Sequence, residues 1–192
     1  MRVIAGKYRS RPLRSLRGMD IRPTSDRLRE TLFNVLTAGS PSALEGSIWL
    51  DLFAGTGAIG IEALSRGARE VHFVDKSKVA AEAIRKNLQS LGIAEGFEIL
   101  QEEPPRAFWR MERQKVAADV VFLDPPYRMK NAYTETLQAL AESPLIWAVS
   151  VVVAEHEKKY DPGEEFGALR RFRHLVQGDA ALSFYQLSNA TE

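Results

Sequence analysis

From residue 48 onward, short apolar segments alternate with segments of helical periodicity, and this alternation restricts the fold more than any other feature. The predicted strands are 48–53, 70–74, 97–100, 120–123 and 149–154. The predicted helices are 57–66, one that Ser77 caps and Gly92 ends, a short one from Pro104, and 132–141. Strands joined by helical crossovers form a mostly parallel sheet that is covered on both faces. The sequence therefore predicts a doubly wound α/β domain of the Rossmann-like kind.

The end of the chain breaks this alternation. Residues 168–176 and 180–187 are strand-like, and only a Gln177-Gly178-Asp179 turn separates them. Two strands joined by so short a turn pair in antiparallel fashion. We therefore expect seven strands, the last two forming a hairpin at the sheet edge.

The first 45 residues are predicted to be a basic extension of the domain at 46–192. Residues 1–29 contain nine of the 26 basic residues and two of the 25 acidic ones, which gives a net charge of +7 there and −6 over the rest. We expect an extended arm or two short strands over 2–18, then a helix that Ser25 or a neighbour caps and that runs to about residue 38. Such a basic segment on an acidic body is typical of phosphate binding, although it is also compatible with a solvated terminus.

Composition excludes several classes of function. The chain has 192 residues and no cysteine, so disulfides, thiolate metal sites and thiol nucleophiles are excluded. The longest apolar segment, 146–154, is far shorter than the roughly 20 residues that span a bilayer. The basic start lacks the apolar region of a secretory signal. We expect a cytoplasmic protein.

A glycine-rich turn follows the first predicted strand of the α/β domain. Residues 55–60 match the pattern G-x-G-x-x-G, and Asp75 lies 20 residues after Gly55 at the end of the next strand. There its carboxylate can accept hydrogen bonds from both hydroxyls of a ribose. A tight structural turn is the alternative, but this setting favours a ligand that contains a nucleoside.

Asp51 indicates which nucleoside ligand binds. A dinucleotide would place its pyrophosphate at the start of the helix, where a carboxylate would repel it. The methionyl end of S-adenosylmethionine carries an ammonium and a sulfonium, both of which favour an acidic neighbour. The sequence therefore favours S-adenosylmethionine over a nicotinamide cofactor.

A second turn, Asp124-Pro125-Pro126-Tyr127, follows the strand at 120–123. Two prolines stiffen it and leave acceptors, namely the Asp124 carboxylate and backbone carbonyls. Hydrogen bonds from both N–H groups of an exocyclic amine to these acceptors would favour a pyramidal nitrogen with a free lone pair. Tyr127 offers an aromatic face for an extruded base. The alternative is a stiff turn that only precedes a helix.

These motifs together resemble a known family. The block Arg-Pro-Thr-Ser-Asp-Arg-Leu-Arg-Glu-Thr-Leu-Phe-Asn at 22–34, the glycine-rich segment 51–67, the turn at 124–127, Glu-His-Glu at 155–157 and the opening Val-Ile-Ala-Gly-Lys at 3–7 are similar to the bacterial 16S rRNA guanine-N2 methyltransferases of the RsmD-like family. The resemblance spans nearly the whole chain. It implies a seven-stranded class I S-adenosylmethionine-dependent methyltransferase that acts on an exocyclic guanine amine in small-subunit rRNA, in an assembled or partly assembled particle.

The resemblance and the motifs give a set of expected site residues. The expected catalytic residues are Asp124, Pro125, Pro126 and Tyr127. The expected cofactor-binding residues are Asp51, Phe53, Ala54, Gly55, Thr56, Gly57, Asp75, Lys76 and Glu103. The expected rRNA-binding residues are Arg2, Lys7, Arg9, Arg11, Arg14, Arg22, Thr24 and Arg27. Two departures from the family stand out, because Glu102-Glu103 replaces its usual Gly-Asp pair and Tyr127 replaces its commoner Phe.

Other residues that could carry chemistry are interpreted as structural. Glu155, His156 and Glu157 are consecutive on a predicted strand, so they point to alternate faces and do not converge on a metal ion. His72 and His174 are expected to be structural, and we expect no metal. The tryptophans Trp49, Trp109 and Trp147 are predicted to lie in the core, with a surface stacking site at Trp109 as the alternative.

Three other functions remain open at this point. A DNA adenine-N6 methyltransferase would use the same Asp-Pro-Pro-Tyr turn, although 192 residues leave little room for a target-reading segment. A nicotinamide-dependent oxidoreductase could be built on the glycine-rich turn. A catalytically silent rRNA-binding assembly factor would keep only the fold. The expected partner is 16S rRNA or the small ribosomal subunit, and without a long heptad pattern we expect a monomer.

Overall fold

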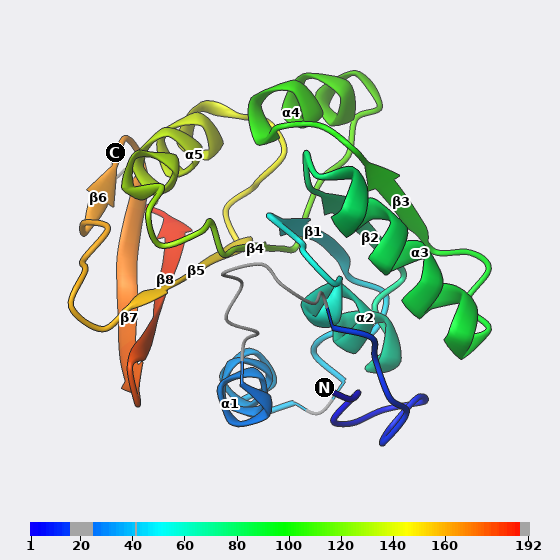
Figure 1. Cartoon of the computed structure of the whole chain (residues 1–192). Coiled ribbons are helices and arrows are strands. Elements are labelled where there is room, and N and C mark those ends of the chain that lie inside the picture. Colours follow the sequence, from blue (N-terminus) through cyan, green and yellow to red (C-terminus); the bar gives the residue numbers. More distant parts are fainter. Residues whose placement is uncertain (16–24, 41, 189–192) are drawn as a thin grey trace.

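The computed structural model describes residues 1–15, 25–40 and 42–188, which form one eight-stranded sheet with helices on both faces (Figure 1). The strand order is β3-β2-β1-β4-β5-β8-β7-β6. The first five strands are parallel, namely β1 (Ile48–Leu52), β2 (Glu70–Val74), β3 (Phe97–Leu100), β4 (Val120–Leu123) and β5 (Val151–Glu157). The predicted doubly wound α/β fold is thus confirmed.

The last three strands extend the sheet in antiparallel fashion. They are β6 (Glu165–Phe166), β7 (Leu169–Gln177) and β8 (Ala180–Leu187), and β8 pairs with both β5 and β7. The predicted hairpin is confirmed, but the predicted number of seven strands is wrong. The additional strand β6 has only two residues and pairs with the start of β7, so it is too short to show a period-2 pattern.

The fifth strand is also shifted from its predicted place. It begins at Val151 instead of residue 149 and continues to Glu157, because Glu155, His156 and Glu157 pair with β8. The prediction ended this strand at residue 154, where the apolar run stops. Pairing with a distant strand decided the boundary, and a local pattern cannot show this.

In the part of the chain that the structure describes, five helices cover the sheet. They are α1 (Asp26–Leu36), α2 (Ala58–Ser65), α3 (Lys78–Leu91), α4 (Pro104–Arg113) and α5 (Lys130–Glu142). Helices α1 to α3 pack on one face in a core around Trp49 and Phe73, and α4 and α5 pack on the other around Leu50 and Leu123. The alternation of Trp49 and Leu50 between the two cores follows from the period-2 geometry of a strand.

The predicted helix caps are confirmed. The Ser25 side chain accepts from the Leu28 N–H, and the Ser77 side chain accepts from the Ala80 N–H. Gly92 ends α3 in the left-handed conformation at φ = 71°. These residues fix where α1 and α3 begin and where α3 ends.

The N-terminal arm, residues 1–15, docks on α2 through a buried carboxylate. Both oxygens of Glu62 accept backbone N–H groups of the arm, from Ile4 at 2.7 Å and Ala5 at 2.9 Å. Arg66 also donates to Glu62, at 2.8 Å. The arm folds back on itself, since the Val3 N–H donates to the Arg11 carbonyl at 2.9 Å and the Leu13 N–H donates to the Met1 carbonyl at 3.0 Å. One antiparallel bridge, between Arg2 and Pro12, lies between these bonds, so the arm is closer to the predicted pair of short strands than to an extended arm. Val3 and Leu13 of the arm belong to the same core as Trp49, so the arm packs on the α/β domain. The division of the chain into two parts near residue 45 stays a prediction.

Two of the three tryptophans are not in the core. Trp49 is fully buried, as predicted, whereas Trp109 and Trp147 are 60% and 48% exposed. The prediction failed at Trp109 because its apolar neighbour Phe108 points inward and Trp109 lies on the outer face of α4.

Within the described residues, no helix is long and apolar enough to cross a membrane.

We predict that Glu62→Gln loosens the arm. A glutamine has one acceptor oxygen, so one of the two arm N–H groups would face an amide N–H₂ and lose its partner, at a cost of about 1–3 kcal/mol. Amide exchange at Ile4 and Ala5 should accelerate, and thermal unfolding should shift to lower temperature. The control is Glu82→Gln, at an exposed position of α3. Equal exchange in both variants would contradict this account of arm docking.

Candidate active site

A pocket of about 780 Å³ opens at the carboxyl ends of β1, β2, β3 and β4. Its walls contain 12 of the 13 residues predicted for catalysis and cofactor binding, all except Gly57. Parallel strands bring their carboxyl ends to one edge of the sheet, so the turns after these strands meet there. The volume lies in the range of about 300–1,000 Å³ that is typical of small-molecule sites.

Asp51 is the innermost acidic residue of the pocket. It lies in β1, is 2% exposed, and accepts from the Gly60 N–H at 2.9 Å. Burial raises its pKa to about 8; the Gly60 hydrogen bond opposes this shift and the nearby Asp75 carboxylate adds to it. At pH 7 the carboxyl is therefore mostly protonated, and a cation beside it would favour the ionised form.

The glycine-rich turn adopts a conformation that its residue types explain. Gly57 ends the turn at φ = 75° and precedes α2, and a Cβ on Gly60 would lie 2.3 Å from the Phe73 ring. Only glycine permits both the left-handed turn and this close approach of α2 to β2. Gly57 is not among the residues that line the pocket; it shapes the turn, and its contact with a cofactor stays a prediction. Phe53 also has positive φ, at 60°, and a non-glycine residue in that region is strained.

Asp75 ties the glycine-rich turn to the end of β2. One carboxylate oxygen accepts from the Gly55 N–H and the other from the Ser77 N–H, both at 2.9 Å. Each oxygen keeps a second lone pair that can accept from a ligand hydroxyl. Lys76 and Glu103 form an exposed ion pair of 3.0 Å at the rim.

The Asp-Pro-Pro-Tyr turn forms the opposite wall. Asp124 follows β4 directly, and burial is the main cause that raises its pKa well above the usual range, with the Glu155 and Asp51 carboxylates adding to it. Such a carboxyl is a stronger base than a solvated aspartate. The Met129 N–H donates to the Pro126 carbonyl at 2.6 Å, which closes the turn ahead of α5.

Tyr133 supports this turn, and the sequence analysis missed it. Its buried hydroxyl donates to the Glu155 carbonyl at 2.9 Å and lies 3.4 Å from the Pro125 carbonyl. Burial raises its pKa above the usual range, so the hydroxyl stays protonated and remains a donor. A tyrosine on the inner face of a predicted helix needs a partner for its hydroxyl, and this requirement was the available signal.

Other lining residues also escaped prediction. Met1 reaches the pocket from the arm, Glu102 and Pro105 flank Glu103, and Glu135 and Thr136 enter from α5. Met1, Glu135 and Thr136 lie outside the motifs, and only the folded chain brings them to the pocket, whereas Glu102 and Pro105 are near neighbours of Glu103 in sequence. Their types carry no signal that could have identified them.

The predicted rRNA-binding residues lie outside the pocket. Arg2, Lys7, Arg9, Arg11 and Arg14 are exposed along the arm, and Arg27 is exposed on α1. Arg22 and Thr24 lie outside the described residues.

Fully buried Asn87 of α3 connects this arm to the pocket. Its Oδ1 accepts from the backbone N–H of Arg14 at 2.8 Å. Its Nδ2 donates to the Arg14 carbonyl at 3.2 Å and to the Thr56 carbonyl at 3.0 Å.

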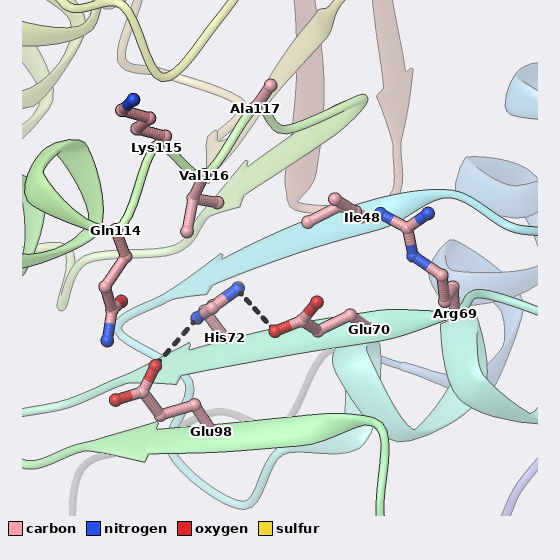
Figure 2. Close-up of a pocket in the computed structure, with 9 residues that line it drawn as sticks. All are labelled: Ile48, Arg69, Glu70, His72, Glu98, Gln114, Lys115, Val116 and Ala117. Carbon is pink, nitrogen blue, oxygen red and sulfur yellow. Dashed lines mark ion pairs between the residues drawn. The ribbon is translucent and has the colours of Figure 1, made fainter.

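A second cavity, of about 440 Å³, lies at the amino ends of the strands. Figure 2 shows His72 there, with its two ring nitrogens 3.2 Å and 3.3 Å from the carboxylates of Glu70 and Glu98. His72 is buried within β2, consistent with the structural role expected of it. This edge carries none of the turns that bind ligands in such sheets.

His156 is enclosed by its own hydrogen bonds. Its Nε2 lies 2.9 Å from the Ser183 hydroxyl and its Nδ1 lies 3.0 Å from the Glu157 carbonyl. Burial lowers its pKa, so the imidazole is neutral at pH 7. Among residues 1–15, 25–40 and 42–188, no group of three or more His, Cys, Asp or Glu side chains could hold a metal ion.

Comparison with known proteins gives consistent matches. A family model described as conserved hypothetical protein 95 matches residues 1–186. The Haemophilus influenzae protein named ribosomal RNA small subunit methyltransferase D is 36% identical over 158 residues, which cover 82% of this chain and 79% of that protein. The Bacillus subtilis protein YlbH, provisionally described as an rRNA methyltransferase, is 31% identical over 97% of this chain and 98% of its own length. An Escherichia coli structure, provisionally described as the methyltransferase yhhF, superposes with a TM-score of 0.79 at 28% identity and covers 97% of both chains.

The fold and the pocket define an S-adenosylmethionine-dependent methyltransferase. The chain belongs to the conserved hypothetical protein 95 family, to which the ribosomal RNA small subunit methyltransferase D proteins belong. The resemblance found in the sequence is thereby confirmed.

We predict that Asp51→Asn stabilises the protein without ligand, and increasingly so as pH rises from 5 to 8. The Asp51 carboxyl has a pKa of about 8 in the folded protein, against a reference value of 3.8 for the unfolded chain. Between these two values, rising pH ionises this carboxyl in the unfolded chain but not in the folded protein, so the free energy of unfolding falls. Above the folded pKa both states are ionised, and a further rise in pH has no effect through this group. The difference in free energy of unfolding between the variant and the wild type should increase by up to about 1.4 kcal/mol per pH unit. Denaturant unfolding at several pH values measures it, with exposed Glu30→Gln as control. A gap that is the same at pH 5 and pH 8 would contradict the buried, protonated Asp51.

Proposed function

We propose that this methyltransferase transfers a methyl group to the exocyclic N2 amine of a guanine in small-subunit rRNA, in an assembled or partly assembled particle. The main support is the acceptor-rich Asp124 turn, which forms one wall of the pocket proposed for the cofactor. The Haemophilus influenzae relative, whose name states that it acts on small-subunit rRNA, supports the substrate class. We place the reaction in the cytoplasm and expect a monomeric enzyme.

The pocket fits S-adenosylmethionine by the chemistry of its side chains. Buried Asp51 can neutralise the ammonium of the methionyl end, and Asp75 has free lone pairs for the ribose hydroxyls. Gly55, Thr56 and the neighbouring backbone form the cradle between them. A pyrophosphate at the start of α2 would meet Asp51, whose ionised form would repel it, and this disfavours a nicotinamide cofactor. Asp75 does not discriminate, because both ligands contain a ribose. When bound, the cofactor supplies a methyl group on a sulfonium, which is already activated for transfer.

The Asp124 turn would prepare the amine. Asp124 and the Pro125 carbonyl accept the two N–H bonds, and the nitrogen becomes pyramidal with its lone pair freed from the ring. Tyr127 packs against the base and fixes its plane. As the nitrogen lone pair forms the bond to the methyl carbon, the bond between that carbon and the sulfonium sulfur would break and leave its electron pair on sulfur as a neutral thioether. The nitrogen would lose one proton, which Asp124 would take up because its raised pKa makes it a competent base. The Tyr133 hydroxyl, which lies 3.4 Å from the Pro125 carbonyl, would hold the turn in place.

The arm would hold the rRNA. The exposed basic residues of the arm lie on the same face of the sheet as α1 to α3, and counterion release on phosphate binding would supply affinity without base specificity. Arg22 and Thr24, named above by the resemblance, would lie near the mouth of the pocket. Asn87 would transmit the position of the arm to the glycine-rich turn.

We predict that the enzyme with S-adenosylmethionine forms N2-methylguanosine in hypomodified small subunits, read by nucleoside mass spectrometry. Asp124→Ala should lower the rate by about 10²–10⁴-fold, as expected for loss of a positioned base. Tyr127→Phe keeps the aromatic face and should stay near the wild-type rate. N6-methyladenosine in a parallel duplex DNA sample would make DNA the substrate. No transfer, with the biological function retained in Asp124→Ala, would favour an assembly factor.

We further predict a pH profile that reports Asp124. The rate at saturating cofactor should fall about tenfold per pH unit below the raised pKa of Asp124, because only the ionised carboxylate accepts the proton. Asp124→Asn keeps an acceptor oxygen but removes the base, so its lower rate should no longer follow this limb. If Asp124→Asn keeps the wild-type rate and profile, Asp124 only orients the amine.

A further inference from the structure

Helix α4 presents an outer face made of arginines and one tryptophan. Arg106, Trp109, Arg110 and Arg113 recur at i, i+3, i+4 and i+7, so they form one stripe along the helix. The opposite face of the helix buries Pro104, Ala107, Phe108 and Met111 against the sheet. The inner face packs on the sheet, and the stripe takes no part in that packing.

Trp109 is the centre of this stripe. It is 60% exposed, although tryptophan is usually largely buried. The Arg113 guanidinium lies over its ring at 4.8 Å from the centroid, which holds the indole in place by a cation–π contact. A held, exposed indole beside arginines offers both a stacking face and positive charge.

The charge of the stripe is positive although the body of the protein is acidic. Glu102 faces two of its arginines, at 2.5 Å from Arg110 and 4.0 Å from Arg106. The one glutamate within α4, Glu112, accepts from the Ser143 hydroxyl at 2.6 Å, toward α5. One carboxylate therefore balances three guanidinium groups, and the side chain of Arg106 is 81% exposed.

The stripe begins at the rim of the active-site pocket. Pro104 and Pro105, the first residues of α4, line that pocket, and Arg106 follows them directly. From Arg106 to Arg113 the helix rises about 10 Å. Helix α4 lies on the opposite face of the sheet from α1 and the N-terminal arm (Figure 1). Arm and stripe thus flank the pocket from two sides.

We infer that this stripe is a second RNA-binding surface, on which Trp109 stacks on an unpaired base next to the target nucleotide while the arginines contact phosphates. The inference rests on the proposed rRNA substrate. Stacking on an exposed aromatic ring and contact with flexible arginines are the two elements of single-strand binding. The Asp-Pro-Pro-Tyr turn needs an extruded base, and a second contact beyond the pocket would hold the strand on the far side of that base.

The test measures binding of protein-free 16S rRNA and of a single-stranded RNA oligonucleotide, independently of methyl transfer. Trp109→Ala should weaken binding roughly 5- to 150-fold, the range for loss of one stacked base. The double variant Arg106→Ala/Arg113→Ala should lower the slope of log affinity against log salt by about 1.4. Affinity for S-adenosylmethionine should not change. The matched controls are Trp147→Ala, exposed near the amino end of β5, and Arg170→Ala on β7, which pairs with Glu165.

Two outcomes would overturn the inference. One is wild-type RNA affinity and salt slope in both α4 variants. The other is a change of oligomeric state or loss of a protein partner in Trp109→Ala with RNA binding intact, which would make the stripe a protein interface. If the wild type binds RNA through α4 but forms no N2-methylguanosine, the proposed function fails and the RNA-binding surface stands.

Discussion

The parallel pairing of β1 with β2 and with β4 is the constraint on which the site depends. Asp51 aligns with Phe73 on one side and with Phe122 on the other, so the three strands end level with one another. Asp51, Asp75 and Asp124 therefore gather at one edge although 73 residues separate the first from the last. A shift of one residue in either pairing would turn these side chains to the other face of the sheet and remove the pocket.

Three carboxyl groups at one buried edge carry an electrostatic cost, which the structure meets in different ways. Both carboxylate oxygens of Asp75 accept hydrogen bonds from backbone N–H groups. Asp51 and Asp124 instead have raised pKa values, because burial and neighbouring carboxylates disfavour their charged forms. The raised pKa values favour a cation next to Asp51 and a proton on Asp124. The same repulsion that destabilises the protein without ligand would be relieved when a cationic cofactor binds.

Most of the fold could be predicted from local patterns, because buried parallel strands and amphipathic helices each have their own periodicity. The strands β2, β3, β4 and β8 lie where they were expected. The two-residue strand β6 and the extension of β5 to Glu157 depend on pairing with other strands, so the local sequence pattern does not predict them. The site was predictable where a motif marks it, as at Gly55 and Asp124. Met1 was missed because only tertiary packing brings it to the pocket, and Tyr133 was missed because its support of the Asp124 turn depends on the distant Glu155 carbonyl. Trp109 was misplaced because its apolar neighbour suggested a buried pair.

The most direct test of this account is calorimetric titration of the wild-type protein with S-adenosylmethionine and with NAD at pH 7, in buffers of different ionisation enthalpy. The account predicts that S-adenosylmethionine binds and that protons are released, because a cation beside the Asp51 carboxyl lowers its pKa, which burial raises to about 8. Asp51→Asn should bind more weakly and release fewer protons. Tight NAD binding without S-adenosylmethionine binding, or binding without proton release, would contradict the central role of Asp51.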